Sequence, residues 1–373
     1  MEKVKNMKIL LLACLTKNKS GNAYGGAEKS IINLSNWLAN HGHDVILASV
    51  EGDQQSFPIE KKVIFKGYNV QKKGKVFTHI QLFLNTQRAF LESKADVVIG
   101  FWIHPMFYLS LNPKSCKAIK IYSERNDPNL EYGKFSKLLR SFVMKSMSGV
   151  VFQTKDAMSY FDKQIQEKSE VIHNPVYINR NEYPVIEDSD NRIVSVGRLS
   201  AQKNYKLLIN AFNKIKDEYK ELKLEIYGEG PKRKELEDYI VLLNLEDRVK
   251  LMGAYPDVIN RIYGARMFVL SSDYEGMPNA LMEAMSIGIP VISSDCPCGG
   301  PRELISDGEN GFLFECASLD SLVFKMREVL NSSDIIRIKK NEKAICDTHN
   351  SDMIFDKWEK FIIKLLQKNK RRN

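Results

Sequence analysis

The chain has 373 residues, of which 43% are hydrophobic and 27% charged, and its formal net charge at pH 7 is +9. At roughly 100–200 residues per domain, this length predicts about two domains, each able to bury a core without disulfides. The composition is that of an ordinary globular protein, which excludes a mini-protein, a coiled coil and a disordered chain.

The positive charge lies in one half of the chain. Residues 1–180 carry 26 Lys and Arg against 15 Asp and Glu, a balance of +11. Residues 181–373 carry 29 against 31, a balance of −2. We therefore expect an anionic partner to bind the first half.

Targeting signals and cysteine spacing bear on the compartment. The six cysteines are scattered, and only Cys296 and Cys298 lie close together, so reduced structural thiols are favoured over disulfides or a zinc site. The apolar run from Ile9 to Leu15 lacks a small-residue cleavage site and is better interpreted as a buried strand than as a signal peptide. No run approaches the ~20 apolar residues of a membrane span. We expect a cytoplasmic protein with at most peripheral membrane contact.

The first half alternates short apolar runs with helical periodicity. A helix is predicted from Ala27 to about His41, ended by Gly42. The predicted strands are Lys8 to Leu15, Asp44 to Ser49, Asp96 to Phe101, Ala118 to Tyr122 and Gly149 to Gln153. Such alternation predicts a parallel, doubly wound sheet.

The second half repeats this alternation after a polar, proline-containing linker at 177–190. The predicted strands are Ile193 to Val196, Leu222 to Tyr227, Val249 to Met252, Met267 to Ser272 and Val291 to Ser294, and the helices are Tyr205 to Lys216, one from Pro231, and Pro278 to Ile287. An amphipathic helix from about Ile354 to Gln367 ends the chain. The predicted fold is α/β, with Rossmann-like domains at 1–176 and 191–353.

Two cations follow the first strand of the second domain. In open α/β sheets, ligands bind beyond the carboxyl ends of the strands. The strand ending at Val196 is followed by Gly197, Arg198 and Lys203. The glycine permits a close backbone approach, and the two cations suit a diphosphate. Taken alone, this loop would equally fit a solvated basic turn.

The segment from Ser271 to Met285 gives a sharper prediction. Pro278 suits the first position of a helix, whose free N–H groups and dipole would then face a phosphate in the crevice. Asn279 and Glu283 share one helix face. An unpaired Glu283 would be costly on a largely buried helix, so we expect it to bind ligand hydroxyls. Glu275, in the preceding loop, would reach another part of the same ligand.

These residues carry a family resemblance. Glu275 and Glu283 form Glu-x7-Glu within Tyr-Glu-Gly-Met-Pro-Asn-Ala-Leu-Met-Glu-Ala-Met, which resembles the signature of retaining GT-B glycosyltransferases of family 4. Further matching segments are Gly25 to Glu28, Ser123 to Asn126, Ile172 to Val176, Val196 to Leu199, Gly228 to Pro231 and Gly299 to Glu303. The resemblance covers nearly the whole chain. It implies two Rossmann-like domains facing across a cleft, with the C-terminal helix, 354–373, returning to the first domain.

In the second domain the resemblance implies a nucleotide-sugar donor site. Arg198 and Lys203 match the diphosphate-binding pair, and Glu283 matches the carboxylate that holds the ribose. Glu275 matches the carboxylate that contacts the donor sugar. The phosphate-facing helix start matches Met277, Pro278, Asn279 and Ala280.

In the first domain the resemblance implies an acceptor site. The loop with Gly25 and Gly26 would close on donor and acceptor, and Glu124 and Arg125 belong to a further matching segment. His104 stands where a family histidine often lies near the reacting sugar. Its surroundings, Phe-Trp-Ile-His-Pro, are only loosely similar to the family, and a lone histidine is often structural.

The chemistry requires stabilising the leaving group. Breaking the bond to the anomeric carbon places negative charge on the diphosphate, which Arg198, Lys203 and the helix start would stabilise, so no metal or other cofactor is expected. Asp188-Ser189-Asp190 lies in the linker and is not expected to bind a metal. The resemblance implies attack on the face from which the nucleotide departs; a covalent intermediate remains an alternative.

The predicted acceptor rests on a basic segment at 132–149. It contains Lys134, Lys137, Arg140 and Lys145 and no acidic residue. The apolar residues among them, Phe135, Leu138, Leu139, Phe142 and Val143, recur at helical spacing, which favours packing on the sheet. Basic residues close to an anionic lipid surface each contribute on the order of 1 kcal/mol of attraction. We therefore predict a peripheral protein at the inner face of the cell membrane.

The predicted substrates and alternatives follow from the same features. The donor would be a UDP-hexose or UDP-N-acetylhexosamine, and the acceptor a lipid-linked or polysaccharide precursor of a bacterial surface glycan; the protein would be a monomer or weak oligomer that binds no nucleic acid. A nucleotide-sugar epimerase on the same fold is one alternative. An NAD(P) oxidoreductase is disfavoured because Gly-x-Gly-x-x-Gly is missing. A non-catalytic protein that binds an anionic polymer would explain the basic half but not Glu283.

Overall fold

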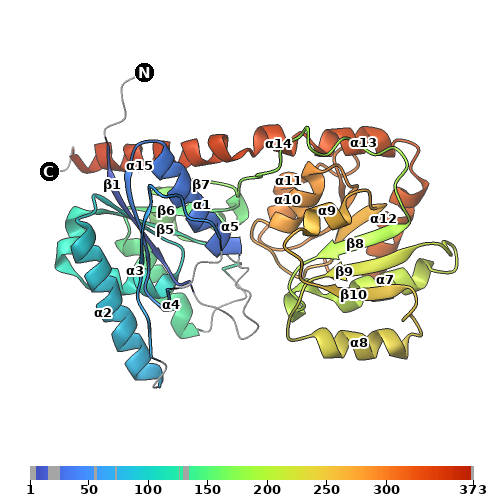
Figure 1. Ribbon diagram of the computed structural model, residues 1–373, viewed down its shortest axis with the longest axis horizontal. Coiled ribbons are helices and arrows are strands. Elements are labelled where there is room, and N and C mark those ends of the chain that lie inside the picture. The colour runs from blue at the N-terminus through green and yellow to red at the C-terminus, as the bar shows by residue number, and fades with distance from the viewer. Residues whose placement is uncertain are drawn as a thin grey trace. The chain divides into compact units, whose positions relative to one another are not determined.

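The computed structural model describes residues 6–15, 26–53, 57–71, 74–125, 127–128 and 134–370. The chain divides into two compact units: unit 1 comprises 1–174 and 352–373, and unit 2 comprises 175–351. Each unit is built on one parallel sheet with helices packed against it (Figure 1). Within the described ranges, no helix has both the length and the apolar character of a membrane span.

Unit 1 contains a seven-stranded parallel sheet of order β3-β2-β1-β4-β5-β6-β7. The strands are β1 (Lys8–Ala13), β2 (Asp44–Ser49), β3 (Ile64–Gly67), β4 (Val97–Gly100), β5 (Ile119–Ser123), β6 (Gly149–Phe152) and β7 (Ser169–Val171). The central strands are continuous apolar runs because helices cover both faces of the sheet. The strand order reverses between β1 and β4.

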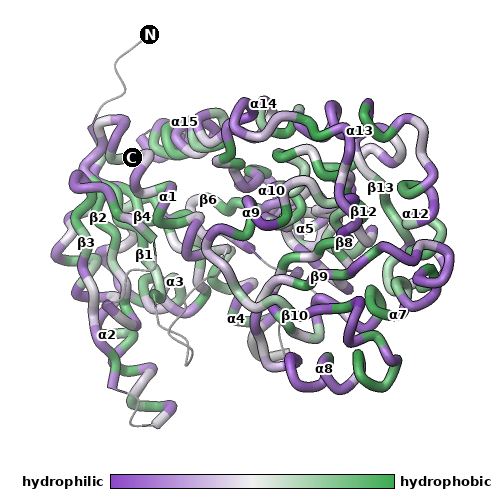
Figure 2. The backbone as a smooth tube through the Cα atoms, turned by 45° about the vertical axis from the view of Figure 1, so that its right-hand side comes forward, coloured by the Kyte–Doolittle hydropathy of each residue, from purple (hydrophilic) through white to green (hydrophobic). Residues whose placement is uncertain are grey.

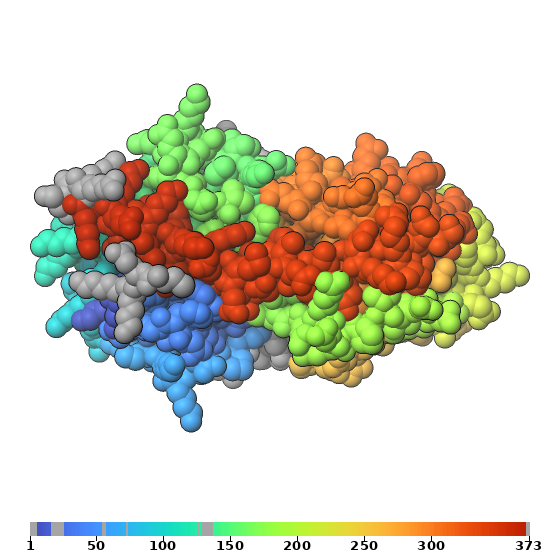
Figure 3. Space-filling model, turned by 90° about the horizontal axis from the view of Figure 1, so that it is seen from above, coloured from blue at the N-terminus to red at the C-terminus, as the bar shows by residue number. Residues whose placement is uncertain are grey.

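The helices of unit 1 include the end of the chain. They are α1 (Gly26–Asn40), α2 (Lys75–Ser93), α3 (Ile103–Ser110), the 3-10 helix η1 (Pro113–Lys117), α4 (Lys134–Ser146), α5 (Lys155–Ser159), α6 (Lys163–Gln166) and α15 (Ser351–Lys370). The apolar face of α15, with Trp358 and Ile362, packs into the same core as β1 and β4. Glu359 of this helix bonds the His43 ring at 2.8 Å. Figure 3 shows α15 crossing unit 1 between N-terminal segments and the segments near residue 150.

Unit 2 contains a six-stranded parallel sheet of order β10-β9-β8-β11-β12-β13. The strands are β8 (Arg192–Val196), β9 (Lys223–Tyr227), β10 (Val249–Gly253), β11 (Met267–Leu270), β12 (Val291–Asp295) and β13 (Phe312–Glu315). The strand order reverses between β8 and β11. Figure 2 shows hydrophobic residues in these strands and mixed polarity along the surrounding helices.

Helices cover both faces of the unit 2 sheet. They are the 3-10 helix η2 (Ala201–Lys203), α7 (Tyr205–Ile215), α8 (Arg233–Leu242), α9 (Val258–Ile262), α10 (Asn279–Ser286), α11 (Gly300–Leu304), α12 (Leu319–Asn331), α13 (Ile335–Glu342) and α14 (Ile345–Thr348). Residues of α7 and α12 form one core layer, and buried residues of α10 form the other. Unit 2 therefore has the two apolar layers expected of a doubly wound sheet.

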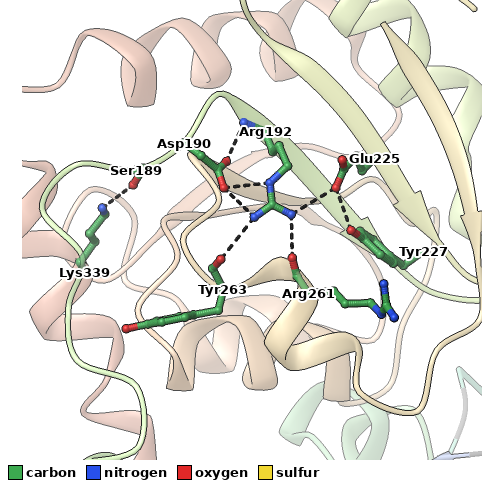
Figure 4. Close-up of polar contacts among 8 residues, drawn as sticks. All are labelled: Ser189, Asp190, Arg192, Glu225, Tyr227, Arg261, Tyr263 and Lys339. Carbon is green, nitrogen blue, oxygen red and sulfur yellow. Dashed lines mark hydrogen bonds and ion pairs between the residues drawn. The ribbon is translucent and has the colours of Figure 1, made fainter. Parts of the chain in front are cut away.

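The end of the predicted linker is anchored to unit 2 by charge. Asp190 Oδ2 accepts hydrogen bonds from Arg192 Nη2 at 2.6 Å and Nε at 2.8 Å (Figure 4). Arg192 Nη1 also donates to Glu225 at 3.2 Å. Burial and the hydrogen bond to Glu225 raise the pKa of Tyr227 to about 12. Asp190, the second aspartate of the Asp-x-Asp sequence, thus has a structural ion pair.

The predicted α/β fold with two parallel sheets is confirmed, but several elements were not predicted. The strands β3 and β7 were missed because they are short edge strands with half-exposed, mixed-polarity residues. β13 is also short and was missed. Helix α2 was missed because its apolar residues surround the helix: Leu82 is buried, whereas Ile80 and Leu84 are exposed.

Candidate active site

The strand reversals locate the candidate sites. Ligand crevices of open parallel sheets form at such reversals, at the carboxyl ends of the strands. In unit 2, β8 and β11 are neighbours. Gly197, Arg198 and Lys203 follow β8, and Glu275 follows β11. The fold thus brings the predicted phosphate-binding loop and the predicted sugar-binding loop to one sheet edge.

Two glycines allow the loops at this edge to approach closely. The N–H of Gly197 donates to the carbonyl of Tyr227 at 2.9 Å. A Cβ on Gly197 would lie 2.9 Å from the Tyr205 hydroxyl and 3.0 Å from Lys203 Cε. A Cβ on Gly228, where φ is +146°, would lie 1.9 Å from the carbonyl oxygen of Gly197. Larger residues at these two positions would displace Lys203 or separate the loops after β8 and β9.

The centre of the unit 2 site is an ion pair. Lys203 Nζ lies 2.6 Å from Glu275 Oε1, with side chains only 15% and 9% exposed. The Ser272 hydroxyl donates to the same Oε1 at 2.6 Å. Both donors bind one carboxylate oxygen, and among the described residues none bonds to Oε2. The geometry therefore fixes the Glu275 carboxylate and leaves its second oxygen for another donor.

Hydrogen bonds hold the two loops together around this pair. Asn204 Nδ2 donates to Asp273 Oδ1 at 2.7 Å, and the Asp273 N–H donates to the carbonyl of Gln202 at 2.9 Å. The Ser271 hydroxyl donates to the carbonyl of Lys203 at 2.8 Å. The loops after β8 and β11 thus form one connected layer, which preorganises the charged groups.

Helix α10 begins beside this layer. Pro278 was predicted at the first helical position, but it is the N-cap residue, with φ −79° and ψ 103°, and its carbonyl accepts the first helical hydrogen bond from Met282. The prediction was wrong by one position because an extended proline also suits the cap. The peptide dipoles of α10 give this helix start a partial positive charge. Met277, just before the cap, is buried.

Glu283 and Arg198 differ in burial. Glu283 lies on the second turn of α10, and it is half-buried between the buried residues Met282 and Ala284. Arg198 is exposed, and its guanidinium makes no hydrogen bond or ion pair with a described residue. Arg198 is thus a solvated cation at the sheet edge, whereas Lys203 is held by Glu275.

In unit 1, His104 follows β4 at the strand reversal and lies on α3. The His104 ring is exposed and lies 5.4 Å, centroid to centroid, from the His79 ring of α2. His79 Nδ1 shares a 2.6 Å hydrogen bond with the Tyr108 hydroxyl. Partial burial lowers the pKa of His104, the charge of His79 lowers it further, and the Glu51 carboxylate opposes both. His104 is therefore favoured as a neutral imidazole near pH 7.

The remaining predicted residues of unit 1 have mixed outcomes. Gly25 lies outside the described residues, and Gly26 begins α1. Glu124 follows β5, is buried, and lies 3.7 Å from the buried Arg140. Arg125 Nη1 donates to Asn174 at 2.6 Å, and its guanidinium lies over a phenylalanine ring. Glu124 and Arg125 thus contribute to the interior of unit 1, and their role toward an acceptor stays a prediction.

The basic segment forms α4, but its residues lie differently from the prediction. Arg140 was counted among the surface cations and is in fact buried, because it pairs with Glu124 and donates to a backbone carbonyl. Leu138 and Phe142 were expected to pack on the sheet, yet they are 72% and 53% exposed. Val143 packs as expected. Helical spacing identified the helix but not which of its two apolar flanks faces the core.

The thiols and acidic residues show no further cluster. The described cysteines are free, and burial raises the pKa of Cys296 to about 12. Over the ranges that the structure describes, no three His, Cys, Asp or Glu side chains are grouped as metal ligands would be.

Three residues of the sites were not predicted. Ser272 lies in the segment from Ser271 to Met285, and the signal available was its place between a buried strand and the glutamate loop. His79 lies on the unpredicted α2, so nothing in the sequence placed it near His104. Tyr108 lies one helical turn after His104, a spacing that places two residues on one helix face.

Comparisons with known proteins agree with this architecture. Residues 24–180 match the model for "Glycosyltransferase Family 4", and residues 179–363 match "Glycosyl transferases group 1". An alpha-1,4-N-acetyl-D-galactosaminyltransferase of Campylobacter jejuni, named for a PP-undecaprenol-linked acceptor, is 24% identical over 91% of this chain and 96% of its own. The amylovoran biosynthesis glycosyltransferase AmsD of Erwinia amylovora is 23% identical over 90% of this chain and 95% of its own.

A solved structure supports the fold. Anabaena HepE in complex with UDP-glucose superimposes with a TM-score of 0.77 at 19% identity, covering 97% of this chain and all of its own.

Proposed function

Because the chain belongs to the group 1 glycosyltransferases of family 4, we propose that it transfers a sugar from a UDP-sugar to a lipid-linked glycan acceptor during synthesis of a bacterial surface glycan. The observation that carries the proposal is the mostly buried ion pair between Lys203 and Glu275 at the strand reversal of unit 2. The cation suits the anionic diphosphate of such a donor, and the carboxylate suits the hydroxyls of its sugar.

The donor's diphosphate would bind three positive features. Arg198 is solvated and directed by no described partner, Lys203 is anchored, and the α10 start offers backbone amides. Glu283, half-buried on the second turn of α10, would accept the ribose hydroxyls. The uridine assignment is supported by HepE, which was solved with UDP-glucose.

Lys203 and Glu275 would exchange partners as the donor binds. A diphosphate oxygen competes with Glu275 for the Lys203 ammonium. The sugar hydroxyls then donate hydrogen bonds to the second carboxylate oxygen of Glu275 and replace the lost interaction. UDP alone would take the Lys203 ammonium away from Glu275 without giving this mostly buried carboxylate a new hydrogen-bond donor. The site would therefore favour the intact donor over UDP, which promotes release of the spent nucleotide.

The chemical step we propose is a same-face substitution. The bond between the anomeric carbon and the diphosphate oxygen breaks, and its electron pair stays on UDP, stabilised by Arg198, Lys203 and the α10 start. The acceptor hydroxyl oxygen bonds to the anomeric carbon, and its proton passes to the departing diphosphate. The configuration at the anomeric carbon is retained, and no metal is part of the step.

The acceptor would reach unit 1 from a membrane surface. Leu138 and Phe142 of α4 are exposed, and so are Val76 and Ile80 of α2. Exposed apolar residues next to lysines suit the interface of an anionic bilayer, where apolar groups insert and cations pair with headgroups. The C. jejuni relative named for a PP-undecaprenol-linked acceptor supports this choice. The protein would then act at the inner face of the cell membrane.

A donor panel tests the proposal. The full chain is incubated with radiolabelled UDP- and GDP-sugars and a bacterial membrane extract, and label in the lipid fraction is counted. We expect transfer from a UDP-sugar, with the anomeric configuration of the product retained by NMR. Transfer from GDP-sugars alone, isomerised free sugar, or an inverted product would contradict the respective part of the proposal.

Membrane attachment is tested separately. Flotation with phosphatidylglycerol vesicles should carry the protein at low salt and release it at high salt. The double variant Leu138→Ser, Phe142→Ser should float less, whereas exposed Leu242 of α8 in unit 2, changed to Ser, serves as a matched control. Equal flotation of both variants would contradict the proposed face.

A further inference from the structure

A cavity of about 390 Å³ lies at the edge of the unit 1 sheet opposite His104. Its walls include Ile119 at the amino end of β5, Ser148 just before β6, and Lys168 just before β7. Leu365 and Lys368 of α15 also line it. All strands of this sheet are parallel, so their amino ends meet at one edge. The acceptor would bind at the opposite edge, where the carboxyl ends of the strands lie beside the strand reversal. The size suits a small polar ligand.

Lysines dominate the charge around this cavity. Lys145, Lys168 and Lys368 line it, and Glu167 is the acidic residue of the wall. Lys145 Nζ pairs with Asp162 at 2.9 Å, outside the lining. Lys368 makes no ion pair with a described residue.

A fourth lysine lies behind the wall. Lys120 is only 7% exposed, and its Nζ lies 3.4 Å from the Ser115 hydroxyl. Burial lowers the pKa of Lys168, and the Asp162 carboxylate raises it. The charges of Lys120, Lys145 and Lys368 lower this pKa further. Among the described residues named here, the lysines outnumber Asp162 and Glu167, and a bound anion would relieve their mutual repulsion.

Lys168 holds a fixed position at the wall. Its Nζ donates to the carbonyl of Lys145 at 2.8 Å and to that of Met147 at 2.9 Å. These carbonyls lie at and just beyond the end of α4, so Lys168 caps that helix. Two of its three N–H donors are thereby used, which leaves one for a further acceptor.

We propose that this cavity binds a phosphate group, carried either by a phosphorylated small molecule or by the headgroup of an anionic phospholipid. Lys168 supplies a rigid donor, Lys145 supplies a cation that is paired with Asp162, and Lys368 supplies an exposed cation at the rim. Gln164 and Ser148 add neutral polar groups to the wall, which suit the ester or hydroxyl part of such a ligand. The proposal does not depend on the donor site in unit 2.

The test compares two double variants of the full chain. Lys145→Gln, Lys368→Gln removes two rim cations and keeps the helix-capping Lys168. Lys357→Gln, Lys360→Gln removes two exposed charges from α15 away from the cavity and is the matched control. Binding is measured by thermal unfolding against inorganic pyrophosphate at constant ionic strength, with UDP present to occupy the donor site, and by sedimentation with phosphatidylglycerol vesicles.

The two arms separate the sources of the phosphate. A saturable pyrophosphate effect that weakens about tenfold in the cavity variant, but not in the control, indicates a soluble phosphorylated ligand if vesicle binding is unaffected. Vesicle binding that falls in the cavity variant alone indicates a phospholipid headgroup. The proposal is overturned if both variants respond equally, which would mean general electrostatics, or if neither arm distinguishes the cavity variant from wild type.

Discussion

The two sheet edges that carry the predicted site residues satisfy their polar groups in different ways. In unit 2, Lys203 and Glu275 are mostly buried and pair at 2.6 Å within two hydrogen-bonded loops. In unit 1, His104 is exposed, and its described neighbours are the rings of His79 and Tyr108. One edge presents fixed charges, and the other presents a neutral, solvent-accessible imidazole.

This difference fits the two substrates that we propose. A diphosphate has one shape and a high charge, so groups that are fixed before it binds stabilise it without reorganisation. A glycan acceptor is mostly neutral, and exposed groups of moderate polarity suit it. Glu124, the predicted site carboxylate of unit 1, lies 3.7 Å from Arg140 inside the unit.

The largest expected effect comes from Glu275→Gln. We expect turnover to fall about 10²–10³-fold, because the charged contact to the donor sugar is lost. Binding of UDP should become about threefold to tenfold tighter, because Lys203 no longer has to leave a carboxylate. Initial rates and calorimetry with UDP measure the two quantities.

The control for this prediction is Glu235→Gln. Glu235 also pairs with lysines in unit 2, Lys206 at 2.8 Å and Lys232, but on the surface. Neither rate nor UDP affinity should change in this variant. Weaker UDP binding in Glu275→Gln would contradict the exchange of partners but not the proposed transferase function. Wild-type protein that binds no UDP would contradict the proposed UDP-sugar donor.

The next effect is expected from Glu283→Gln. Loss of a charge-assisted hydrogen bond to the ribose should cost about 1.5–3 kcal/mol of binding free energy, for UDP and UDP-sugar alike. Calorimetry with both ligands measures this loss. Glu328→Gln on α12, which removes a half-exposed carboxylate paired with Lys325, is the control. A loss confined to the UDP-sugar would show that Glu283 contacts the sugar rather than the ribose.

Much of the fold and the unit 2 site could be predicted from the sequence, for a physical reason. Buried parallel strands are apolar throughout, so β1, β2, β8 and β9 were identified to within two residues at either end. Short edge strands such as β7 carry no such signal.

The contacts within the sites could not be predicted. Lys203 and Glu275 are 72 positions apart, and the sequence assigned them to opposite ends of the donor rather than to each other. The burial of Arg140 depends on Glu124, which lies on another element. The motifs identify which residues lie at one edge of the sheet. Which of these side chains pair with each other depends on how the loops pack, and loop packing leaves no periodic pattern in the sequence.

A smaller effect is expected from Ser272→Ala. The hydroxyl shares Glu275 Oε1 with Lys203, so its removal loosens the carboxylate without changing any charge. Turnover should fall about threefold to tenfold, with UDP affinity unchanged within about twofold. Steady-state kinetics and calorimetry measure both. Ser321→Ala, at the start of α12, is a matched control that should leave both unchanged, and an equal loss in the two variants would indicate a general loss of stability.

The smallest effect concerns the pH response of His104. Partial burial and His79 lower the pKa of His104, and Glu51 raises it. Glu51→Gln should therefore lower the pKa of His104 further, and His79→Gln should raise it above the wild-type value. NMR titration of the His104 ring, assigned with His104→Gln, measures this order.

The sign of the stability effect follows from the same shift. Because the pKa of His104 is lowered in the folded protein, the unfolded chain binds the proton first as the pH falls. The contribution of this residue to the free energy of unfolding is thus complete above the ordinary histidine pKa and is lost as the pH falls through the lowered value. The exposed Glu60, changed to Gln, is the control and should leave the titration unchanged. If Glu51→Gln and His79→Gln moved the titration in the same direction, the two groups would not act on His104 by charge.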